Sequence, residues 1–196
     1  MTDLRVPGQD PSVQRDGTGP TLPSEDAGFR ALFHREAGYV WATLRRLGVH
    51  PSDVEDVTQE VMLRVFRLQG DYDPSRPLRP WIFGIAHRVA AEWRRHRRRH
   101  PENPTDFDDR DLASTQGDAE AAVAARQAKA LVERALLAVE VDRRAVFILH
   151  DLEGCPAPDI ARTLEIPVNT AYSRLRLARE EFRAEVARLH SGRTGR

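Results

Sequence analysis

The sequence predicts an all-α protein, with two small helical domains joined by a flexible acidic linker. In residues 25–100 and 119–190, apolar side chains recur at the three- and four-residue steps of helices, and neither segment shows the sustained alternation of a strand. Residues 101–118 between them are acidic and contain two prolines and a glycine, which break helices. Residues 1–24 contain four prolines and few apolar residues, so we expect a disordered N-terminal arm.

The composition is that of an ordinary soluble protein. Apolar residues make up 40% and charged residues 31% of the 196 residues, and no run approaches the roughly 18 apolar residues of a membrane span. Residues 1–24 lack the apolar core of a secretory signal. Cys155 is the only cysteine, which excludes an internal disulfide and disfavours a cysteine-based metal site. We therefore expect a cytoplasmic protein with no membrane association, no metal and no other cofactor.

Charge is balanced overall but segregated locally. The chain carries 30 basic and 30 acidic residues, which by itself argues against nucleic-acid binding. However, Arg88–His100 contains six arginines and one glutamate, and the stretch from Pro101 to Glu120 contains seven acids and one arginine. Adjacent blocks of opposite charge indicate two surfaces with different partners, and guanidinium groups suit phosphate contacts.

The first helix is expected over Glu25–Leu47. Its apolar residues fall on one face, at Phe29, Leu32, Phe33, Ala37, Val40, Trp41 and Leu44. Gly48 and Pro51 end this helix, and Ser52 or Asp53 can cap the next one.

A second helix, Asp53–Leu68, is expected to have two different faces. Its core stripe recurs at steps of three or four residues, at Val54, Val57, Val61, Val65 and Leu68. The opposite face holds polar and acidic residues together with two large apolar ones: Asp56, Gln59, Glu60, Leu63 and Phe66. Acids that surround apolar side chains are typical of a protein–protein contact. The alternative is that Leu63 and Phe66 pack against a neighbouring helix.

A third helix, Leu78–Arg99, begins apolar and ends basic. Its expected buried face consists of Trp81, Ile82, Ile85, Ala86, Val89 and Trp93. Such a helix can lie along phosphates while its first turns stay in a core. Phe83 and the two tryptophans could also stack on unpaired bases, although tryptophan at helical spacing usually belongs to the core. The arginine run could be a solvated helix end, but its density favours phosphate binding.

The last segment, Asp142–Leu189, has the pattern of a helix-turn-helix. A helix that Gly154 ends is followed by a short helix with a proline in its first turn, a turn at 165–167 and a longer helix. The core stripe of the longer helix is Ala171, Leu175, Ala178, Phe182, Val186 and Leu189. Its other side carries Asn169, Thr170, Ser173 and Arg176, flanked by Tyr172 and Arg174. This is typical of a recognition helix in which Arg176 reads guanine and Asn169 adenine; the alternative is a helical hairpin with a polar outer face.

Together these segments resemble a known family. Region two of the bacterial RNA polymerase sigma factors is similar to DVEDVTQEVMLRVFR followed by RPWIFGIAHRVAAEWRRHRRR, and region four is similar to DLEGCPAPDIARTLEIPVNTAYSRLRLAR. The order and spacing of these segments resemble the extracytoplasmic-function (ECF) group, the smallest sigma factors. The resemblance covers about residues 25–100 and 125–185. It implies an alternative sigma factor that directs promoter recognition and transcription initiation.

The resemblance also implies three sets of site residues. The second helix would dock on the clamp helices of the polymerase β′ subunit through Asp56, Gln59, Glu60 and Leu63. The third helix would open and hold the minus-ten element through Trp81, Phe83, His87, Arg88, Arg94, Arg95, Arg97 and Arg98. The recognition helix would bind the duplex minus-thirty-five element through Asn169, Thr170, Tyr172, Ser173, Arg174 and Arg176. Arg88 stands where the family often has asparagine, which affects the minus-ten base preference.

The partners that follow from the resemblance are core RNA polymerase, through its β′ and β subunits, promoter DNA and an anti-sigma factor. The acidic linker would run through the polymerase interior along the template path.

The runner-up function is a conventional dimeric helix-turn-helix regulator, which would bind a palindromic duplex tightly without polymerase. A sigma factor alone would bind DNA weakly, because polymerase fixes the separation of its two DNA-binding halves. An enzyme is disfavoured, since there is no glycine-rich phosphate loop and no repeated metal-ligand spacing.

Overall fold

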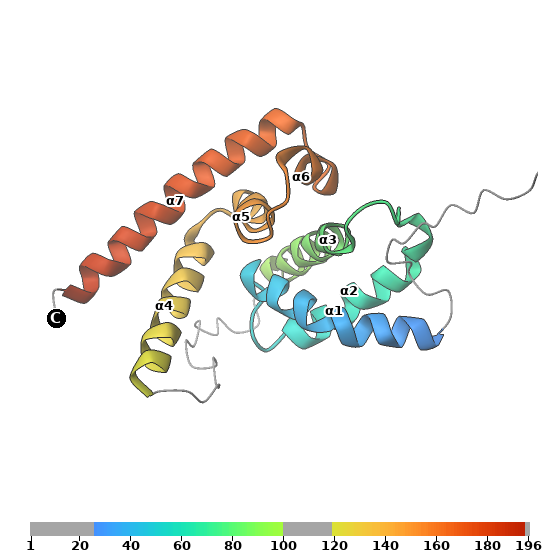
Figure 1. Ribbon diagram of the computed structural model, residues 1–196, viewed down its shortest axis with the longest axis horizontal. Helices are drawn as coiled ribbons and strands as arrows, with labels where there is room; N and C mark the ends of the chain where they lie inside the picture. Colours follow the sequence, from blue (N-terminus) through green and yellow to red (C-terminus); the bar gives the residue numbers. More distant parts are fainter. Residues whose placement is uncertain (1–25, 100–118, 195–196) are drawn as a thin grey trace, which may run out of the picture.

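The computed structural model describes residues 26–99 and 119–194, and every regular element within these ranges is helical (Figure 1). In chain order the elements are α1 (Asp26–Arg46), α2 (Val54–Arg67), the short 3-10 helix η1 (Gln69–Asp71), α3 (Leu78–Arg99), α4 (Ala119–Ala138), α5 (Val141–Phe147), the π-helical turn η2 (Ile148–Leu152), α6 (Ala157–Thr163) and α7 (Val168–Thr194). The predicted all-α fold is confirmed. The expected N-terminal arm, 1–24, and the acidic linker, 101–118, lie outside the described residues. Within the described ranges, no helix combines the length and the apolar composition that crossing a bilayer requires.

The first half of the chain is a three-helix unit formed by α1, α2 and α3. The four valines of the predicted α2 stripe are buried, and α2 packs against both α1 and α3. Leu68 was expected to continue the stripe but is 37% exposed. The reason is that α2 ends at Arg67 and the backbone of Leu68 has left the helical conformation.

Trp41 is a second departure from the predicted core. It was expected in the apolar face of α1 but is 38% exposed. The buried row of α1 passes through Val40 and Leu44, and Trp41 is displaced from that row by one residue. The Arg45 guanidinium lies over its ring, with the guanidinium carbon 5.9 Å from the ring centre. The tryptophan therefore forms part of the surface, where a cation covers one of its faces.

The turn after α1 depends on Gly48. This residue has φ of +87°, in the left-handed region where glycine is favoured. The Gly48 N–H donates to the Arg45 carbonyl and the Val49 N–H to the Leu44 carbonyl, each at 3.0 Å. These are the two hydrogen bonds of a Schellman motif. The predicted end of the first helix is confirmed.

Asp53 has a different role from the expected cap. It precedes α2, but its carboxylate accepts no hydrogen bond from the N–H groups of that helix. It accepts hydrogen bonds from Trp93 Nε1 at 3.0 Å and Arg97 Nη1 at 2.5 Å, both on α3. Burial raises the pKa of this carboxyl, but hydrogen bonds from Ser52, Trp93 and Arg97 outweigh burial and hold the pKa below its usual value. Asp53 thus joins the start of α2 to the basic end of α3.

The second half of the chain is organised by α7, which packs against α4, α5 and α6. The first part of its predicted stripe, Ala171, Leu175 and Ala178, is buried. Phe182 is half-buried, and its ring centre lies 5.0 Å from that of Phe147 on α5. The later positions of the stripe are also only half-buried. Gly154, with φ of +70°, ends the segment before α6 as predicted.

The two helical units share an interface that the sequence did not indicate. Their buried apolar residues form one continuous cluster. Helix α3 packs against α6, and α1 packs against α4. Figure 1 shows α3 lying beside α5 and α6 of the second half. The core of the first unit is therefore continuous with that of the second.

Arg144 is a buried cation in this interface. Its guanidinium donates to the carbonyls of Leu137 at 2.6 Å, Val139 at 2.8 Å and Arg46 at 3.3 Å. These carbonyls belong to the end of α4 and to the last residue of α1, where the helix dipole favours positive charge. Burial, together with the charge of Arg94, lowers the pKa of Arg144 to about 10. The side chain therefore remains charged at neutral pH and supplies donors to two helix ends.

Replacement of Arg144 by alanine should lower the free energy of unfolding by about 2–4 kcal/mol, because buried carbonyls at two helix ends lose their donors. Urea denaturation followed by circular dichroism measures the change. Arg143→Ala is the matched control, since Arg143 forms a partly exposed ion pair with Glu181, and such pairs contribute about 0–1 kcal/mol. Equal losses for the two variants would contradict the role assigned to Arg144.

Candidate nucleic-acid interface

The outward face of α2 carries the polar set that the sequence predicted. Asp56 and Gln59 are exposed, and Glu60 is half-buried. Glu60 accepts a hydrogen bond from Arg64 Nε at 2.8 Å, and Arg64 also pairs with Glu92 of α3 at 2.6 Å. The face therefore holds Asp56 and Glu60 together with two arginines: Arg64, which is paired with two glutamates, and Arg67, which is exposed.

Two large apolar residues interrupt this face. Leu63 is 48% exposed and Phe66 is 36% exposed. The Phe66 ring centre lies 4.7 Å from that of Phe29 on α1. The sequence allowed two interpretations of this pair, contact with a protein partner and packing against a neighbouring helix, and each applies to one of the two residues. Phe66 packs against a neighbouring helix, whereas Leu63 remains accessible to a partner.

Two arginines at the basic end of α3 are anchored to the first half. Arg97 pairs with Asp53, and its guanidinium carbon lies 5.5 Å from the centre of the Trp93 ring. Arg94 Nη1 donates to the Leu47 carbonyl at 3.2 Å. These contacts hold the direction of the helix end. Farther from the core, Arg95 and Arg98 are exposed.

The expectation that Phe83 contacts bases is wrong. Its side chain is fully buried, with 0% exposure. Helix α3 is enclosed by α1 and α2 and also by α6, so its buried arc is wider than the single stripe that the spacing predicted. Trp81 is half-buried at the edge of the core, with its ring centre 5.1 Å from that of Tyr72.

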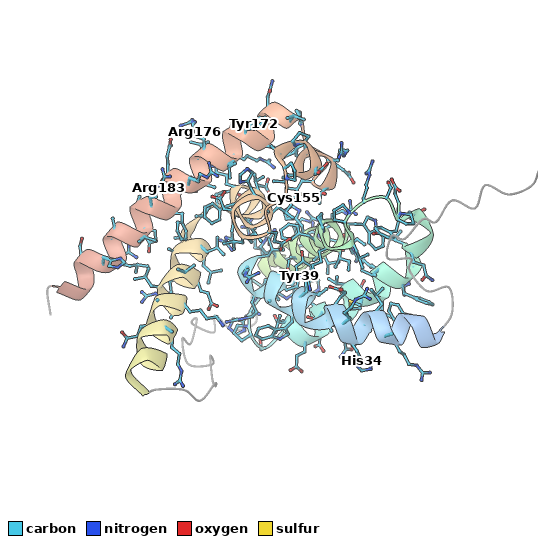
Figure 2. All side chains as sticks on the ribbon, in the orientation of Figure 1. His34, Tyr39, Cys155, Tyr172, Arg176 and Arg183 are labelled. Carbon is cyan, nitrogen blue, oxygen red and sulfur yellow. The ribbon has the colours of Figure 1, made fainter. Side chains whose placement is uncertain are left out.

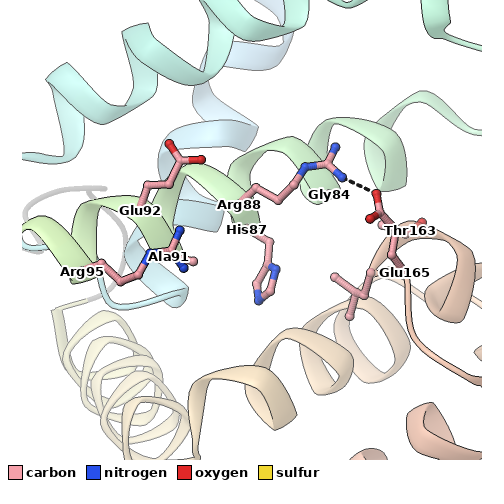
Figure 3. Close-up of a pocket in the computed structure, with 9 residues that line it drawn as sticks. Gly84, His87, Arg88, Ala91, Glu92, Arg95, Thr163 and Glu165 are labelled. Atoms are coloured by element: carbon pink, nitrogen blue, oxygen red, sulfur yellow. Dashed lines mark hydrogen bonds and ion pairs between the residues drawn. The ribbon is translucent and has the colours of Figure 1, made fainter.

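His87 and Arg88 of α3 face the second half of the chain. Arg88 Nη1 pairs with Glu165 Oε1 at 2.7 Å, as the dashed line in Figure 3 shows. His87 Nε2 is buried and makes no hydrogen bond to the described residues, and Asp142 Oδ1 lies 3.7 Å from it. Burial lowers the pKa of His87 below its usual value, although the charge of Asp142 acts in the opposite direction. A cavity of about 300 Å³ lies beside these residues, between α3 and the end of α6.

The turn between α6 and α7 contains a residue with unusual backbone geometry. Glu165 has φ of +56°, the one non-glycine residue with positive φ among those the structure describes. The Ile166 N–H donates to the Ala161 carbonyl at 2.9 Å, and the Glu165 N–H donates to the Arg162 carbonyl at 3.3 Å. Glu165 therefore occupies the left-handed position of a Schellman motif, which glycine usually fills. The predicted turn is present, but the strain at Glu165 could not be read from the sequence.

The predicted recognition residues begin α7. Asn169, Tyr172, Ser173 and Arg176 are exposed, and Figure 2 shows Tyr172 and Arg176 projecting from the outer side of the helix. The Ser173 hydroxyl donates to the carbonyl of Thr170, which is half-buried. Arg176 Nη1 pairs with Glu180 at 2.7 Å within the same helix.

Arg174 differs from its neighbours on α7. Its guanidinium points to α5, where it pairs with Asp142 Oδ2 at 3.1 Å. Asp142 thus lies between Arg174 and His87, which come from the two predicted DNA-binding sets. The sequence did not single out Asp142.

A larger cavity, of about 840 Å³, opens between the loop before α3 and the segment around Cys155. At its wall, the Tyr39 hydroxyl donates to Glu153 at 2.9 Å, and the Arg79 guanidinium carbon lies 5.0 Å from the centre of the Tyr39 ring. Burial raises the pKa of Tyr39 and also that of Glu153. Tyr39 and Glu153 are 114 residues apart in the sequence, so no local pattern could have paired them. Cys155 is buried here, as expected of a small packed side chain.

These surfaces suit binding: α2 has a face of acidic and apolar side chains, and α3 and α7 are arginine-bearing helices. In the described residues, no cluster of three or more histidine, cysteine, aspartate or glutamate side chains could hold a metal ion. The class that the fold and these surfaces define is a helical protein that binds nucleic acid and a protein partner.

Comparison with known proteins gives the family. Residues 32–100 match Sigma-70 region 2, and residues 129–182 match Sigma-70 region 4. The ECF RNA polymerase sigma factor SigL of Mycobacterium tuberculosis is 30% identical over 168 residues, which cover 85% of this chain and 93% of SigL. The RNA polymerase sigma factor CnrH of Cupriavidus metallidurans is 30% identical over 162 residues, which cover 80% of this chain and 85% of CnrH.

Solved structures show the same fold. CnrH in complex with the cytosolic domain of CnrY matches with a TM-score of 0.56 and 22% identity, over 82% of this chain and 88% of that chain. The sigma factor RpoE in complex with the anti-sigma factor NepR from Bartonella quintana matches with a TM-score of 0.63 and 17% identity, over 81% and 96%. The chain belongs to the sigma-70 family, in its ECF group. It is an alternative sigma factor that directs promoter recognition, and the alternative of a conventional dimeric regulator is not supported.

The environment of His87 predicts a loss of stability at acid pH. Because the pKa of His87 is lowered in the folded chain, the unfolded chain takes up a proton more readily as the pH falls through about 6.5. The free energy of unfolding should therefore be smaller at about pH 5.5 than at about pH 7.5. The decrease should be reduced in His87→Gln and retained in His34→Gln, which replaces an exposed histidine of α1. An unchanged decrease in His87→Gln, measured by urea denaturation, would contradict this assignment.

Proposed function

We propose that this sigma factor acts in the cytoplasm and docks on core RNA polymerase through α2. Its helix α3 engages the minus-ten element and its helix α7 engages the minus-thirty-five element. The protein itself takes no part in the chemistry of transcription. One observation carries the proposal: the face of acidic and apolar side chains on α2 is separate from the two arginine-bearing helices, α3 and α7. Region 2 holds the first of these helices and region 4 the second, in the order of the family.

The polymerase contact is assigned to the outward face of α2. Leu63 supplies an exposed apolar anchor, and Asp56, Gln59 and Glu60 surround it. A buried apolar anchor within a polar rim is the usual anatomy of a protein interface. The acidic rim favours a basic partner surface and speeds the encounter with it. This supports the clamp helices of the β′ subunit as the docking site.

The minus-ten contact is assigned to the exposed cations of α3. Arg95 and Arg98 are open to solvent, and Trp81 and Arg88, nearer the start of the helix, line the large cavity. Arginines of this kind contact phosphates, while a half-buried ring offers a surface on which an unpaired base can stack. Phe83 has no place in this site because it is buried. Arg94 and Arg97 act indirectly, since their hydrogen bonds fix the direction of the helix end.

The minus-thirty-five contact is assigned to the start of α7. Asn169, Tyr172, Ser173 and Arg176 share its exposed side, which suits the major groove of a duplex. Thr170, beside them, is half-buried. Arg174 would reach the duplex only after its pair with Asp142 opens.

An anti-sigma factor is the remaining proposed partner. Two structures that share the fold are complexes of CnrH with the cytosolic domain of CnrY and of RpoE with the anti-sigma factor NepR. The cavity between the two halves of this chain offers both apolar and charged side chains to such a protein. The acidic linker is proposed to follow the template path inside polymerase.

Run-off transcription with purified core polymerase tests the function on upstream regions of the chain's own genome. We expect specific initiation only when the protein is present. Glu60→Lys should weaken core binding at least about tenfold, because it reverses a charge of the docking face, and circular dichroism should be unchanged. Glu185→Lys is the control, with the same charge change on α7, where Glu185 pairs with Arg188. Tight binding to a palindrome without polymerase, and no initiation, would establish a dimeric regulator instead.

Arg176→Ala tests the reading of the minus-thirty-five element. If Arg176 forms a bidentate contact with guanine, its loss should cost about 1–3 kcal/mol of promoter binding and relax the preference at one position. The measurement is holoenzyme affinity for a set of promoters with single base changes. Arg183→Ala, farther along the exposed side of α7 (Figure 2), serves as control. An equal loss on every promoter would show that Arg176 contacts phosphate only.

A further inference from the structure

We propose that Val168 and Tyr172 form an apolar reading surface for the C5 methyl groups of thymine in the minus-thirty-five element. This inference deepens the proposed function, because it rests on the assignment of α7 to the major groove. Both residues lie at the start of α7, four positions apart, and they are 40% and 55% exposed. Tyr172 belongs to the predicted recognition set, whereas Val168 does not.

Val168 stands at the leading end of the recognition helix. It is the first residue of α7, and the carbonyl of Pro167 before it accepts hydrogen bonds from the N–H groups of Thr170 at 2.9 Å and Ala171 at 3.1 Å. In helix-turn-helix proteins, the N-terminal residues of the recognition helix contact the base edges. Because helical side chains lean toward the N-terminus, the apolar side chain of Val168 would enter the groove with the first turn.

The apolar pair continues into an arginine along the same row of the helix. Val168, Tyr172 and Arg176 follow one another at four-residue steps, which places them on one side of α7. Figure 2 shows Tyr172 and Arg176 projecting from the outer side of the helix. In the major groove, thymine presents its C5 methyl group, and guanine presents the acceptors O6 and N7. This row therefore suits thymine beside a guanine that Arg176 contacts.

The polar side chains around the pair are already engaged within the chain. Ser173 donates to a backbone carbonyl of its own helix at 3.0 Å. Arg176 pairs with Glu180 at 2.7 Å, and Arg174 pairs with Asp142 at 3.1 Å. Each of these groups must exchange an existing hydrogen bond for one to DNA, and such an exchange yields little net free energy. Burial of the exposed apolar surface needs no exchange of this kind.

The charge around the pair favours DNA over a protein as its partner. Residues 168–179 contain three arginines and no acidic residue, so the surface that surrounds the pair suits an anionic partner. A DNA groove is lined by phosphates on both sides and carries thymine methyl groups on its floor. It thus offers both the anionic and the apolar groups that this part of α7 matches.

The test uses holoenzyme and a promoter identified by run-off transcription, whose minus-thirty-five element should contain thymine. Replacement of these thymines by deoxyuridine removes the C5 methyl group and leaves the base pair unchanged. We expect the affinity of the parent holoenzyme to fall about fourfold for each contacted methyl group, which is the effect of burying one methyl group. Deoxyuridine in the spacer between the two promoter elements is the control and should leave the affinity unchanged.

Protein variants assign the effect to the pair. Val168→Ala and Tyr172→Ala should bring the ratio of affinities for the thymine and deoxyuridine promoters toward one. Tyr172→Phe should keep the parental ratio, because the ring and not the hydroxyl contacts the methyl group. Val132→Ala is the matched control, since Val132 is a valine of similar exposure, 42%, on α4. It should also keep the parental ratio.

Three results would overturn the inference: a minus-thirty-five element without thymine, equal affinity of the parent for the thymine and deoxyuridine promoters, or a parental ratio in both alanine variants. Initiation by the parent protein on the same promoter would leave the proposed function standing in each case. No initiation on any upstream region would overturn the proposed function itself.

Discussion

Helix α3 has to satisfy two environments at once, and the rest of the structure depends on that constraint. Its first turns supply fully buried side chains to the core, among them Ile82 and Phe83, and its last turns are arginines. A charged group cannot be enclosed by protein unless it is paired or hydrogen-bonded. Every arginine of α3 that turns inward therefore requires an acceptor from another element. This requirement explains why Asp53, just before α2, reaches α3 instead of capping its own helix.

Two kinds of acceptor meet this requirement, and they have different consequences. Carbonyls at helix ends accept from Arg94 and Arg144, and these contacts join helices without neutralising the arginine charge. Carboxylates accept from Arg88 and Arg174 at partly exposed positions. Such pairs can be exchanged for phosphates, because a phosphate offers the same type of oxygen acceptor. The first kind of contact builds the fold, whereas the second leaves the proposed DNA-binding residues able to change partners.

The helices could be predicted from the sequence because periodicity and breakers act locally. The valines of α2 and the end of α1 at Gly48 follow from spacing and from left-handed geometry alone. Periodicity identifies the residues that share a face but not how many neighbours cover that face, which is why Phe83 was assigned to DNA although α6 helps to enclose its helix. Long-range pairs such as Tyr39 with Glu153 have no local pattern at all. Helical spacing indicated the binding faces of α2 and α7 and the basic end of α3, the family resemblance assigned their partners, and neither identified Glu165 and Asp142 as the acids that face them.

The polar contacts between the halves are individually weak, although the halves also share a continuous apolar core. The Arg88–Glu165 side chains are 49% and 74% exposed, and pairs this accessible contribute at most about 1 kcal/mol. The bonds from Tyr39 to the partly buried Glu153 add about 1–3 kcal/mol. Because the halves belong to one chain, a weak attraction still holds them together at the high effective concentration of a tether. A partner that binds one half with micromolar affinity supplies about 8 kcal/mol. Such binding separates the halves only to the extent that the partner binds the separated arrangement more tightly than the closed one.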